Sequence, residues 1–122
     1  MPRPILEEAR IHPAIREVIA GHHSAIVREA EAAIAASPVV VIGMKQNPFV
    51  KKARRALDAA GVRYKYLEYG SYFNTWRPRN ALKMWTGWPT FPIVFVKGAL
   101  VGGAADLDAL IASGELQRLL AG

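Results

Sequence analysis

The chain has 122 residues, of which 52% are hydrophobic and 21% charged, and its formal net charge is +6. This length predicts one domain, which can bury enough surface to fold without disulfides or a structural metal. The sequence contains no cysteine. That excludes a thiolate nucleophile, a disulfide bond, and cysteine ligation of zinc or of an iron–sulfur cluster by this chain.

The positive charge is concentrated in the middle of the chain. Residues 39–100 carry eleven Lys or Arg against two acids, residues 1–38 four against five, and residues 101–122 one against three. Such asymmetry is typical of proteins that bind nucleic acid, membrane phosphate or an acidic small ligand. The charge pattern alone does not distinguish these three kinds of partner. Because no apolar run approaches a membrane span and the first residues lack a signal-peptide layout, we expect a cytoplasmic protein without a membrane segment.

The first forty residues predict two helices. Pro13 suits the first turn of a helix that Gly21 ends. Ser24 can cap a second helix, which Ser37-Pro38 ends. Apolar residues recur at helical spacing in both segments, which predicts one apolar face on each helix.

A strand, a helix and a second strand follow. The β-branched run 39–42 lies between Pro38 and Gly43, which is typical of a fully buried strand. Asn47-Pro48 combines a favoured N-cap with a favoured first helical residue, so we expect a helix from there to Gly61. Residues 62–69 alternate enough to form the second strand. Together these elements predict a right-handed βαβ unit.

The last third predicts a hairpin between helices. Residues 70–78 form an aromatic-rich loop and residues 79–85 a short helix. Residues 91–96 and 100–101 form two antiparallel strands around a tight turn. Residues 106–111 begin the last helix, and residues 115–120 add a final turn or two. The element order predicts an α/β fold, with a mixed four-stranded sheet and helices on both faces.

Four segments in this order resemble those of the glutaredoxin family, which has the thioredoxin-like fold. They are Met44-Lys45 with Asn47-Pro48-Phe49-Val50, Trp88-Pro89-Thr90-Phe91-Pro92, the stretch 96–103 that ends in Gly102-Gly103, and Ser113-Gly114-Glu115-Leu116. The resemblance implies a glutaredoxin-like domain at residues 24–122 and a helical extension at residues 1–23.

The chain departs from the family at the redox motif. The family carries Cys-x-x-Cys or Cys-x-x-Ser at the start of the helix, whereas Asn47 and Val50 stand at the two motif positions here. Thiol–disulfide exchange requires a thiolate that attacks a disulfide. We therefore expect no catalytic residue, no oxidoreductase activity of this chain alone, and no iron–sulfur cluster bound through its own cysteine.

Apart from the redox motif, the resemblance implies a glutathione site. It implies that Lys45 and Arg79 hold the glycine carboxylate, that the backbone of Phe91, before a cis Pro92, pairs with the middle residue, and that amides after the glycine pair receive the γ-glutamyl end. The family has an acidic or hydroxyl side chain where Ala104 and Ala105 stand, and Asp106 comes one position late. The complete predicted set is Lys45, Asn47, Phe49, Arg79, Phe91, Pro92, Gly103, Ala104 and Ala105.

Three functions remain open at this stage. The leading hypothesis is non-covalent binding of glutathione, or of a glutathionylated or other partner protein, in the cleft between Asn47 and Pro92. The second is a cysteine-substituted variant of an active glutathione-dependent oxidoreductase, for which Val50→Cys would create activity because the second motif position faces the cleft. The third is a ligand-free interaction module. Asn47 itself has a sufficient explanation as a helix cap, and ligand contact is left open.

Nucleic-acid and metal binding are the weaker alternatives. A basic helix face is ordinarily solvated, although nearby aromatic residues provide rings on which bases could stack. The basic residues are Lys51, Lys52, Arg54 and Arg55, and the aromatic ones are Tyr72, Phe73, Trp76, Trp85 and Trp88. No nucleic-acid motif is present, so we do not expect a nucleic-acid partner. His12, His22 and His23 lack the spacing of a metal site, so we expect no metal.

Overall fold

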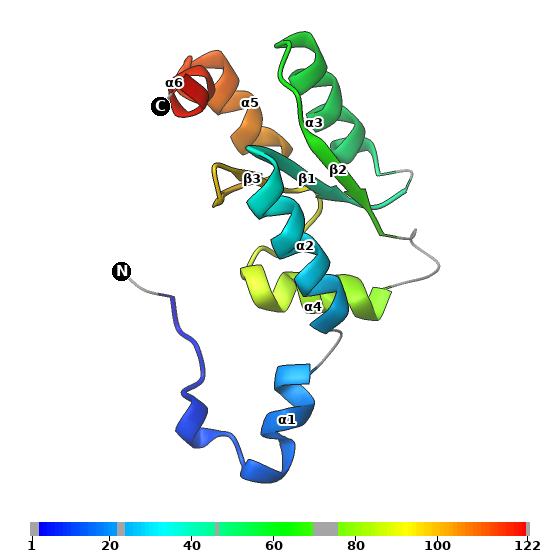
Figure 1. The fold of residues 1–122 in the computed structure, drawn as a ribbon, viewed down its shortest axis with the longest axis vertical. Helices are drawn as coiled ribbons and strands as arrows, with labels where there is room; N and C mark the ends of the chain where they lie inside the picture. Colours follow the sequence, from blue (N-terminus) through cyan, green and yellow to red (C-terminus); the bar gives the residue numbers. More distant parts are fainter. Residues whose placement is uncertain (1–2, 22–23, 46, 70–75, 122) are drawn as a thin grey trace.

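The structure is a computed structural model that describes residues 3–21, 24–45, 47–69 and 76–121. A short 3-10 turn at Glu8–Arg10 precedes the regular elements. These are α1 (Pro13–Gly21), α2 (Ser24–Ala36), β1 (Val39–Gly43), α3 (Pro48–Ala59), β2 (Lys65–Glu68), α4 (Trp76–Thr86), β3 (Ile93–Val96), β4 (Ala99–Gly102), α5 (Ala104–Ala112) and α6 (Glu115–Ala121), shown in Figure 1.

The four strands form one mixed sheet in the order β2-β1-β3-β4. β1 runs parallel to β2 and antiparallel to β3, and β3 pairs antiparallel with β4. The predicted mixed sheet, its parallel pair and its hairpin are thus confirmed. A register shift between Val94 and Phe95 marks an irregularity in the hairpin ladder.

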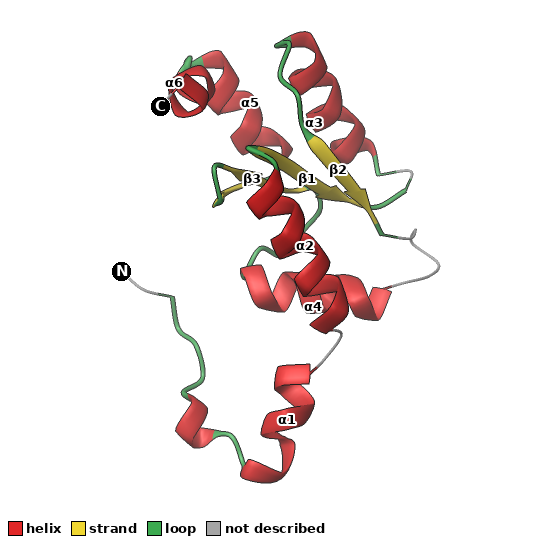
Figure 2. Cartoon of the chain, viewed as in Figure 1, coloured by secondary structure: helices red, strands yellow, loops and turns green. Residues whose placement is uncertain are grey.

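Two apolar cores lie on the two faces of the sheet. Alternate residues of β1 point to opposite faces, as the pleat requires: Val40 and Ile42 join the core under α2 and α4, whereas Val39 and Val41 join the core under α3 and α5. Figure 2 shows these helix pairs on opposite sides of the strands. Since every residue of β1 is buried, β1 is the central strand that both layers share.

Several predicted boundaries were wrong, and one of them is that of the first hairpin strand, which covers residues 93–96 instead of 91–96. The second strand covers only residues 65–68 instead of 62–69. α4 begins at Trp76, so the end of the predicted aromatic loop is helical, while residues 70–75 of that loop, including Tyr72 and Phe73, lie outside the described residues. α5 begins at Ala104, two residues before the predicted start. The backbone N–H of Gly103 donates to Asp106 Oδ2 at 3.0 Å, and this cap explains the earlier start.

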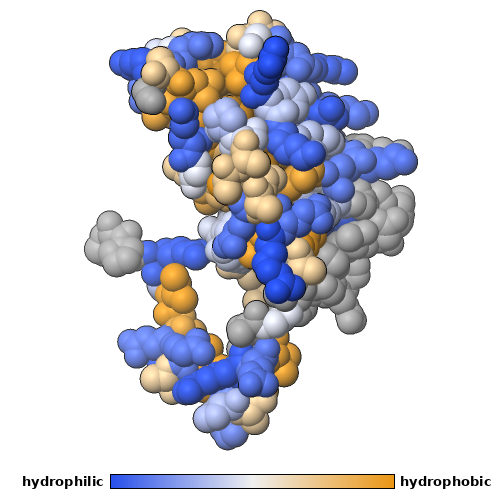
Figure 3. All heavy atoms as spheres, viewed as in Figure 1, coloured by the Kyte–Doolittle hydropathy of each residue, from blue (hydrophilic) through white to orange (hydrophobic). Residues whose placement is uncertain are grey.

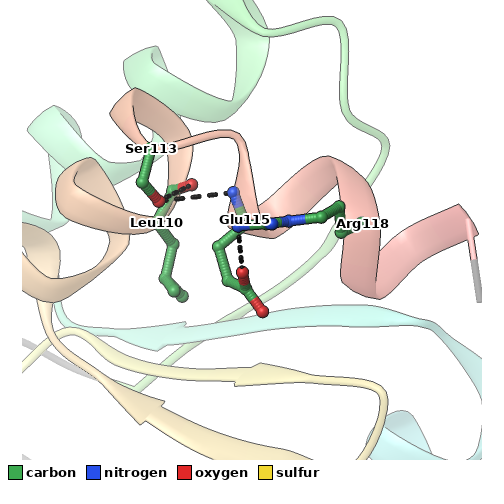
Figure 4. A network of polar contacts seen from close by, with 4 residues as sticks. All are labelled: Leu110, Ser113, Glu115 and Arg118. Atoms are coloured by element: carbon green, nitrogen blue, oxygen red, sulfur yellow. Dashed lines mark hydrogen bonds and ion pairs between the residues drawn. The ribbon is translucent and has the colours of Figure 1, made fainter.

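The turn between α5 and α6 is held by short-range polar contacts (Figure 4). Ser113 Oγ donates to the carbonyl of Leu110 at 3.2 Å and accepts from the backbone N–H of Glu115 at 3.3 Å. Glu115 also pairs with Arg118 one turn later. Gly114 has a φ of +79°, which only glycine adopts without strain. The predicted family-like segment is therefore a helix-to-helix turn.

α1 stands apart from the sheet and the other helices (Figure 1). Ile15 and Val18 of α1 are 49% and 66% exposed, so the apolar face predicted for this helix is not buried in the core. The guanidinium of Arg3 fills the space where a side chain at Gly87 would lie. The boundary between residues 23 and 24 stays a prediction, and His22 and His23 lie outside the described residues. No helix in the described part of the chain could cross a membrane.

Packing of α3 on β1 requires a glycine at position 43. A Cβ built on Gly43 would lie 2.6 and 2.8 Å from the two γ-carbons of Val50, so we predict that Gly43→Ala lowers the free energy of unfolding by about 1–3 kcal/mol. Urea denaturation measures this loss. In a Val50→Ala background the added methyl has room, and the cost of Gly43→Ala should shrink; an equal cost in both backgrounds would contradict this packing.

Candidate functional site

The first turn of α3 is fixed by the side chain of Asn47. Its Oδ1 accepts hydrogen bonds from the backbone N–H groups of Phe49 at 2.9 Å and Val50 at 3.1 Å. Pro48 occupies the first helical position, where no N–H is needed. Asn47 is only 7% exposed, and the predicted helix start is confirmed. The two hydrogen bonds explain Asn47 fully as a helix cap. Contact between Asn47 and a ligand stays a prediction.

A cleft of about 300 Å³ opens between the start of α3, the segment before β3 and the start of α5. Its lining residues are Phe49, Trp88, Thr90, Phe91, Pro92, Gly103, Ala104, Ala105 and Asp106. The structure thus brings together six of the nine predicted residues, from three separate stretches of the chain. The peptide bond between Phe91 and Pro92 is cis. Phe49, at 62% exposure, forms an open rim.

Lys45 and Arg79 do not line this cleft. Lys45 is exposed in the connection after β1. Arg79 is 6% exposed, and its Nη1 donates to the carbonyl of Tyr69 at 3.1 Å. Tyr69 in turn donates its backbone N–H to the carbonyl of Gly43 at 2.9 Å, so both cations flank the carboxyl end of β1. Burial lowers the pKa of the Arg79 guanidinium, which still remains charged. Their roles toward glutathione stay predictions.

The second motif position does not face the cleft, contrary to the sequence prediction. Val50 is 2% exposed and packs against the backbone of Gly43. Ala53 and Leu57, which are also buried, follow it at helical spacing. The position therefore belongs to the inner face of α3, and a thiol placed there would be enclosed by the core.

The start of α5 forms the far wall of the cleft. Ala104 is buried and Ala105 exposed. The Oδ2 atom of Asp106 accepts a hydrogen bond from the backbone N–H of Gly103, and the residue is exposed at the wall of the cleft. The remaining first-turn amides of a helix are a favourable place for a carboxylate.

Three lining residues were not among the predicted site residues: Trp88, Thr90 and Asp106. Thr90 is exposed at the cleft, and Trp88 is half-buried. The indole Nε1 of Trp88 is buried and has no hydrogen-bond partner among the described residues. Trp88 and Thr90 both belong to the segment 88–92 that resembles the glutaredoxin family. Their closeness to Pro92 in the sequence could therefore have predicted them as site residues. Behind the cleft, Lys83 Nζ lies 5.6 Å from the centroid of the Phe91 ring, a cation–π distance.

A second cavity of about 540 Å³ lies between the end of α2, the end of α4 and the hairpin. Ile34, Trp85 and Phe95 form its apolar wall, and Glu31 and Lys97 lie at its rim. Sequence reasoning did not find it, because its walls come from three separate elements. Among the described residues there is no group of three His, Asp or Glu that could hold a metal ion.

Comparison with known proteins assigns the chain to a family. The glutaredoxin family model matches residues 39–101. A glutaredoxin-like protein of Dictyostelium discoideum is 46% identical over 102 residues, which cover 84% of this chain and 83% of that protein. Glutaredoxin-C4 of Oryza sativa is 36% identical over 92 residues, covering 75% of this chain and 69% of the relative.

Solved structures agree with this assignment. The buckwheat glutaredoxin–glutathione complex matches with a TM-score of 0.73 at 24% identity, covering 83% of this chain and 92% of the other. Oxidized glutaredoxin 2 from Chlamydomonas reinhardtii matches with a TM-score of 0.69 at 30% identity, covering 80% and 92%. The fold and cleft define a thioredoxin-like protein without a thiol. The chain belongs to the glutaredoxin family, and it contains no cysteine.

The Asn47 cap can be tested directly. Asn47→Ala removes the acceptor of two backbone N–H groups, and we predict a loss of about 1 kcal/mol in the free energy of unfolding, measured by urea denaturation. Asn47→Asp is the matched control, because its carboxylate can accept the same bonds and is favoured at a helix N-terminus. Equal stability of wild type and Asn47→Ala would contradict the assigned role.

Proposed function

We propose that this protein binds glutathione, free or attached to a partner protein, without forming a covalent bond to it. The observation that carries the proposal is the cleft of about 300 Å³ around Phe49, Phe91 and Gly103, which persists although Asn47 stands where the family has its reactive cysteine. The buckwheat glutaredoxin with which the chain shares its fold was solved as a glutathione complex, which supports the choice of ligand.

The chemistry of the cleft suits an anionic peptide. The main chain of Phe91 pairs with the middle residue of the ligand, and the amides at the start of α5 receive the γ-glutamyl carboxylate. Lys45 and Arg79 attract the glycine carboxylate from the end of β1. The apolar walls at Phe49 and Pro92 exclude water from these contacts, which strengthens them.

Titration with reduced glutathione tests this proposal. We predict that amide shifts in heteronuclear NMR spectra concentrate at Phe49, Phe91, Ala104 and Ala105 and saturate in the millimolar range or below. Lys45→Ala should weaken the affinity several-fold, because an opposite charge is lost. Arg28→Ala removes a cation from the exposed surface of α2 and is the control. A spectrum that does not change at millimolar glutathione would overturn the proposal.

A second candidate, a cysteine-substituted variant of an active oxidoreductase, is favoured by the geometry at Asn47. Its Oδ1 accepts two backbone N–H groups at the start of α3. A thiolate in that place would accept the same donors and meet the positive end of the helix dipole, both of which lower a thiol pKa.

Two cysteine variants separate the positions. We predict that the thiol of Asn47→Cys has a pKa below the ordinary value of about 8.5, measured from the pH dependence of alkylation by iodoacetamide. Val50→Cys should stay unreactive until the protein unfolds, because Val50 is 2% exposed. This second expectation replaces the sequence-based one. A thiol at position 47 with an ordinary pKa and no glutathione-dependent turnover would reject the second candidate.

A further inference from the structure

A basic surface runs along the outer face of α3. Residues 45–65 contain seven Lys or Arg against one acid, Asp58, and every one of these side chains is exposed. We call the five that lie on α3 or directly before it the basic surface: Lys45, Lys51, Lys52, Arg54 and Arg55. Lys65 is not part of it, because it is paired with Val40, whose side chain lies on the α2 and α4 face of the sheet. Figure 3 shows hydrophilic side chains projecting at the margin of the molecule where α3 lies.

The charge order within α3 opposes helix stability. Cations are favoured in the last turn of a helix and acids in the first. In α3 the first turn contains no acid, Lys51 and Lys52 lie near its start, and Asp58 lies near its end. Lys51 and Arg55 are also like charges at i and i+4, which destabilises a helix by about 0.2–0.5 kcal/mol. The stability of α3 therefore does not explain this pattern.

The contacts of the basic side chains divide them into two groups. Lys52 pairs with Asp108 of α5 at 3.5 Å. Arg54 lies 4.0 Å from the centroid of the Tyr66 ring and donates to the hydroxyl of Tyr64 at 3.3 Å. Within the described part of the chain, no carboxylate lies within ion-pair distance of Lys51 or Arg55.

These two unpaired cations occupy the centre of the exposed face of α3. Val50, Ala53 and Leu57 mark the buried face, and at 3.6 residues per turn positions 51 and 55 lie roughly opposite to it. Lys52 and Arg54 flank them, toward α5 and β2. A partner that approaches α3 thus meets Lys51 and Arg55 first.

The basic surface begins at the rim of the cleft. Phe49, which lines the cleft, lies in the first turn of α3, and Lys51 follows two residues later. Lys45 lies before the helix, on the other side of Asn47. When the glutathionyl group of a partner polypeptide enters the cleft, the residues next to its modified cysteine therefore lie over the basic surface. The sign of the charge on these flanking residues then affects the affinity of the partner.

We propose that the basic surface selects partner proteins whose glutathionylated cysteine is flanked by acidic residues. This inference rests on the proposed function and names its partner class. A protein is favoured over a nucleic acid because the basic surface adjoins the cleft proposed for the glutathionyl group, whose rim takes up the one exposed ring of α3, that of Phe49. Tyr64 and Tyr66 are only half-exposed and Arg54 covers the Tyr66 ring, so these two rings present no open platform on which bases can stack.

Short fluorescent peptides test the proposal. Each carries a central glutathionylated cysteine, flanked by Glu, Ser or Lys, and a second set carries the same flanks around an unmodified Ser. Fluorescence anisotropy at low salt should give the Glu peptide an affinity on the order of 10-fold above the Lys peptide, which corresponds to ~1.4 kcal/mol. The preference should shrink as salt is added, because exposed charges are screened.

Charge reversal supplies the decisive variant. Lys51→Glu with Arg55→Glu should abolish or invert the preference between the Glu and Lys peptides. Arg10→Glu with Arg28→Glu makes the same change in net charge at exposed positions on the N-terminal segment and α2, and should leave the preference intact. Circular dichroism checks that both variants are folded.

The possible results distinguish a failure of the basic-surface proposal from a failure of the cleft proposal. Glutathionylated peptides that bind equally, whatever their flanks, would overturn the basic surface and leave the cleft proposal standing. A Glu preference that persists around unmodified Ser, with no response to glutathione, would support the surface and reject the cleft. A single-stranded oligonucleotide of matched charge that binds more tightly than the Glu peptide, and is lost in the α3 variant, would overturn the choice of a protein partner.

Discussion

The two hydrogen bonds that Asn47 Oδ1 accepts from the backbone of Phe49 and Val50 determine where α3 begins. That starting point places Phe49 at the rim of the cleft and turns Val50 inward against Gly43. In the wider family this helix terminus holds a reactive sulfur. Here a neutral amide oxygen meets the same donors, so the helix start is retained without a thiol, and the role that we propose for the cleft is recognition.

α3 contributes both to the cleft and to the basic surface. α3 contributes Phe49 to the cleft at its first turn and exposed cations along its outer face. Its buried face is committed to β1, and the contacts of Lys52 with Asp108 and of Arg54 with Tyr64 and Tyr66 anchor its flanks. The helix is thus well held from three sides while its outer face stays available. This arrangement explains how the chain tolerates a charge order that an isolated helix would disfavour.

Local signals predicted the fold well, because each one depends on a few neighbouring residues. Asn47-Pro48 predicted the start of α3, and the β-branched run after Pro38 predicted the central strand. Errors arose where tertiary contacts decide. The carboxylate of Asp106 draws the start of α5 back to Ala104, and packing against Gly43 turns Val50 away from the cleft. The burial of Arg79 against Tyr69 likewise depends on a partner ten residues away, which spacing alone does not reveal.

A crystal structure grown with reduced glutathione shows whether a cleft without a thiol still binds this tripeptide. We expect the tripeptide between Phe49 and Gly103, with its middle residue paired to the main chain of Phe91 and its γ-glutamyl carboxylate at the start of α5. Asn47 should keep both of its backbone bonds in the complex. A cleft closed by the side chain of Phe49, or glutathione bound elsewhere on the protein, would contradict the proposed glutathione site.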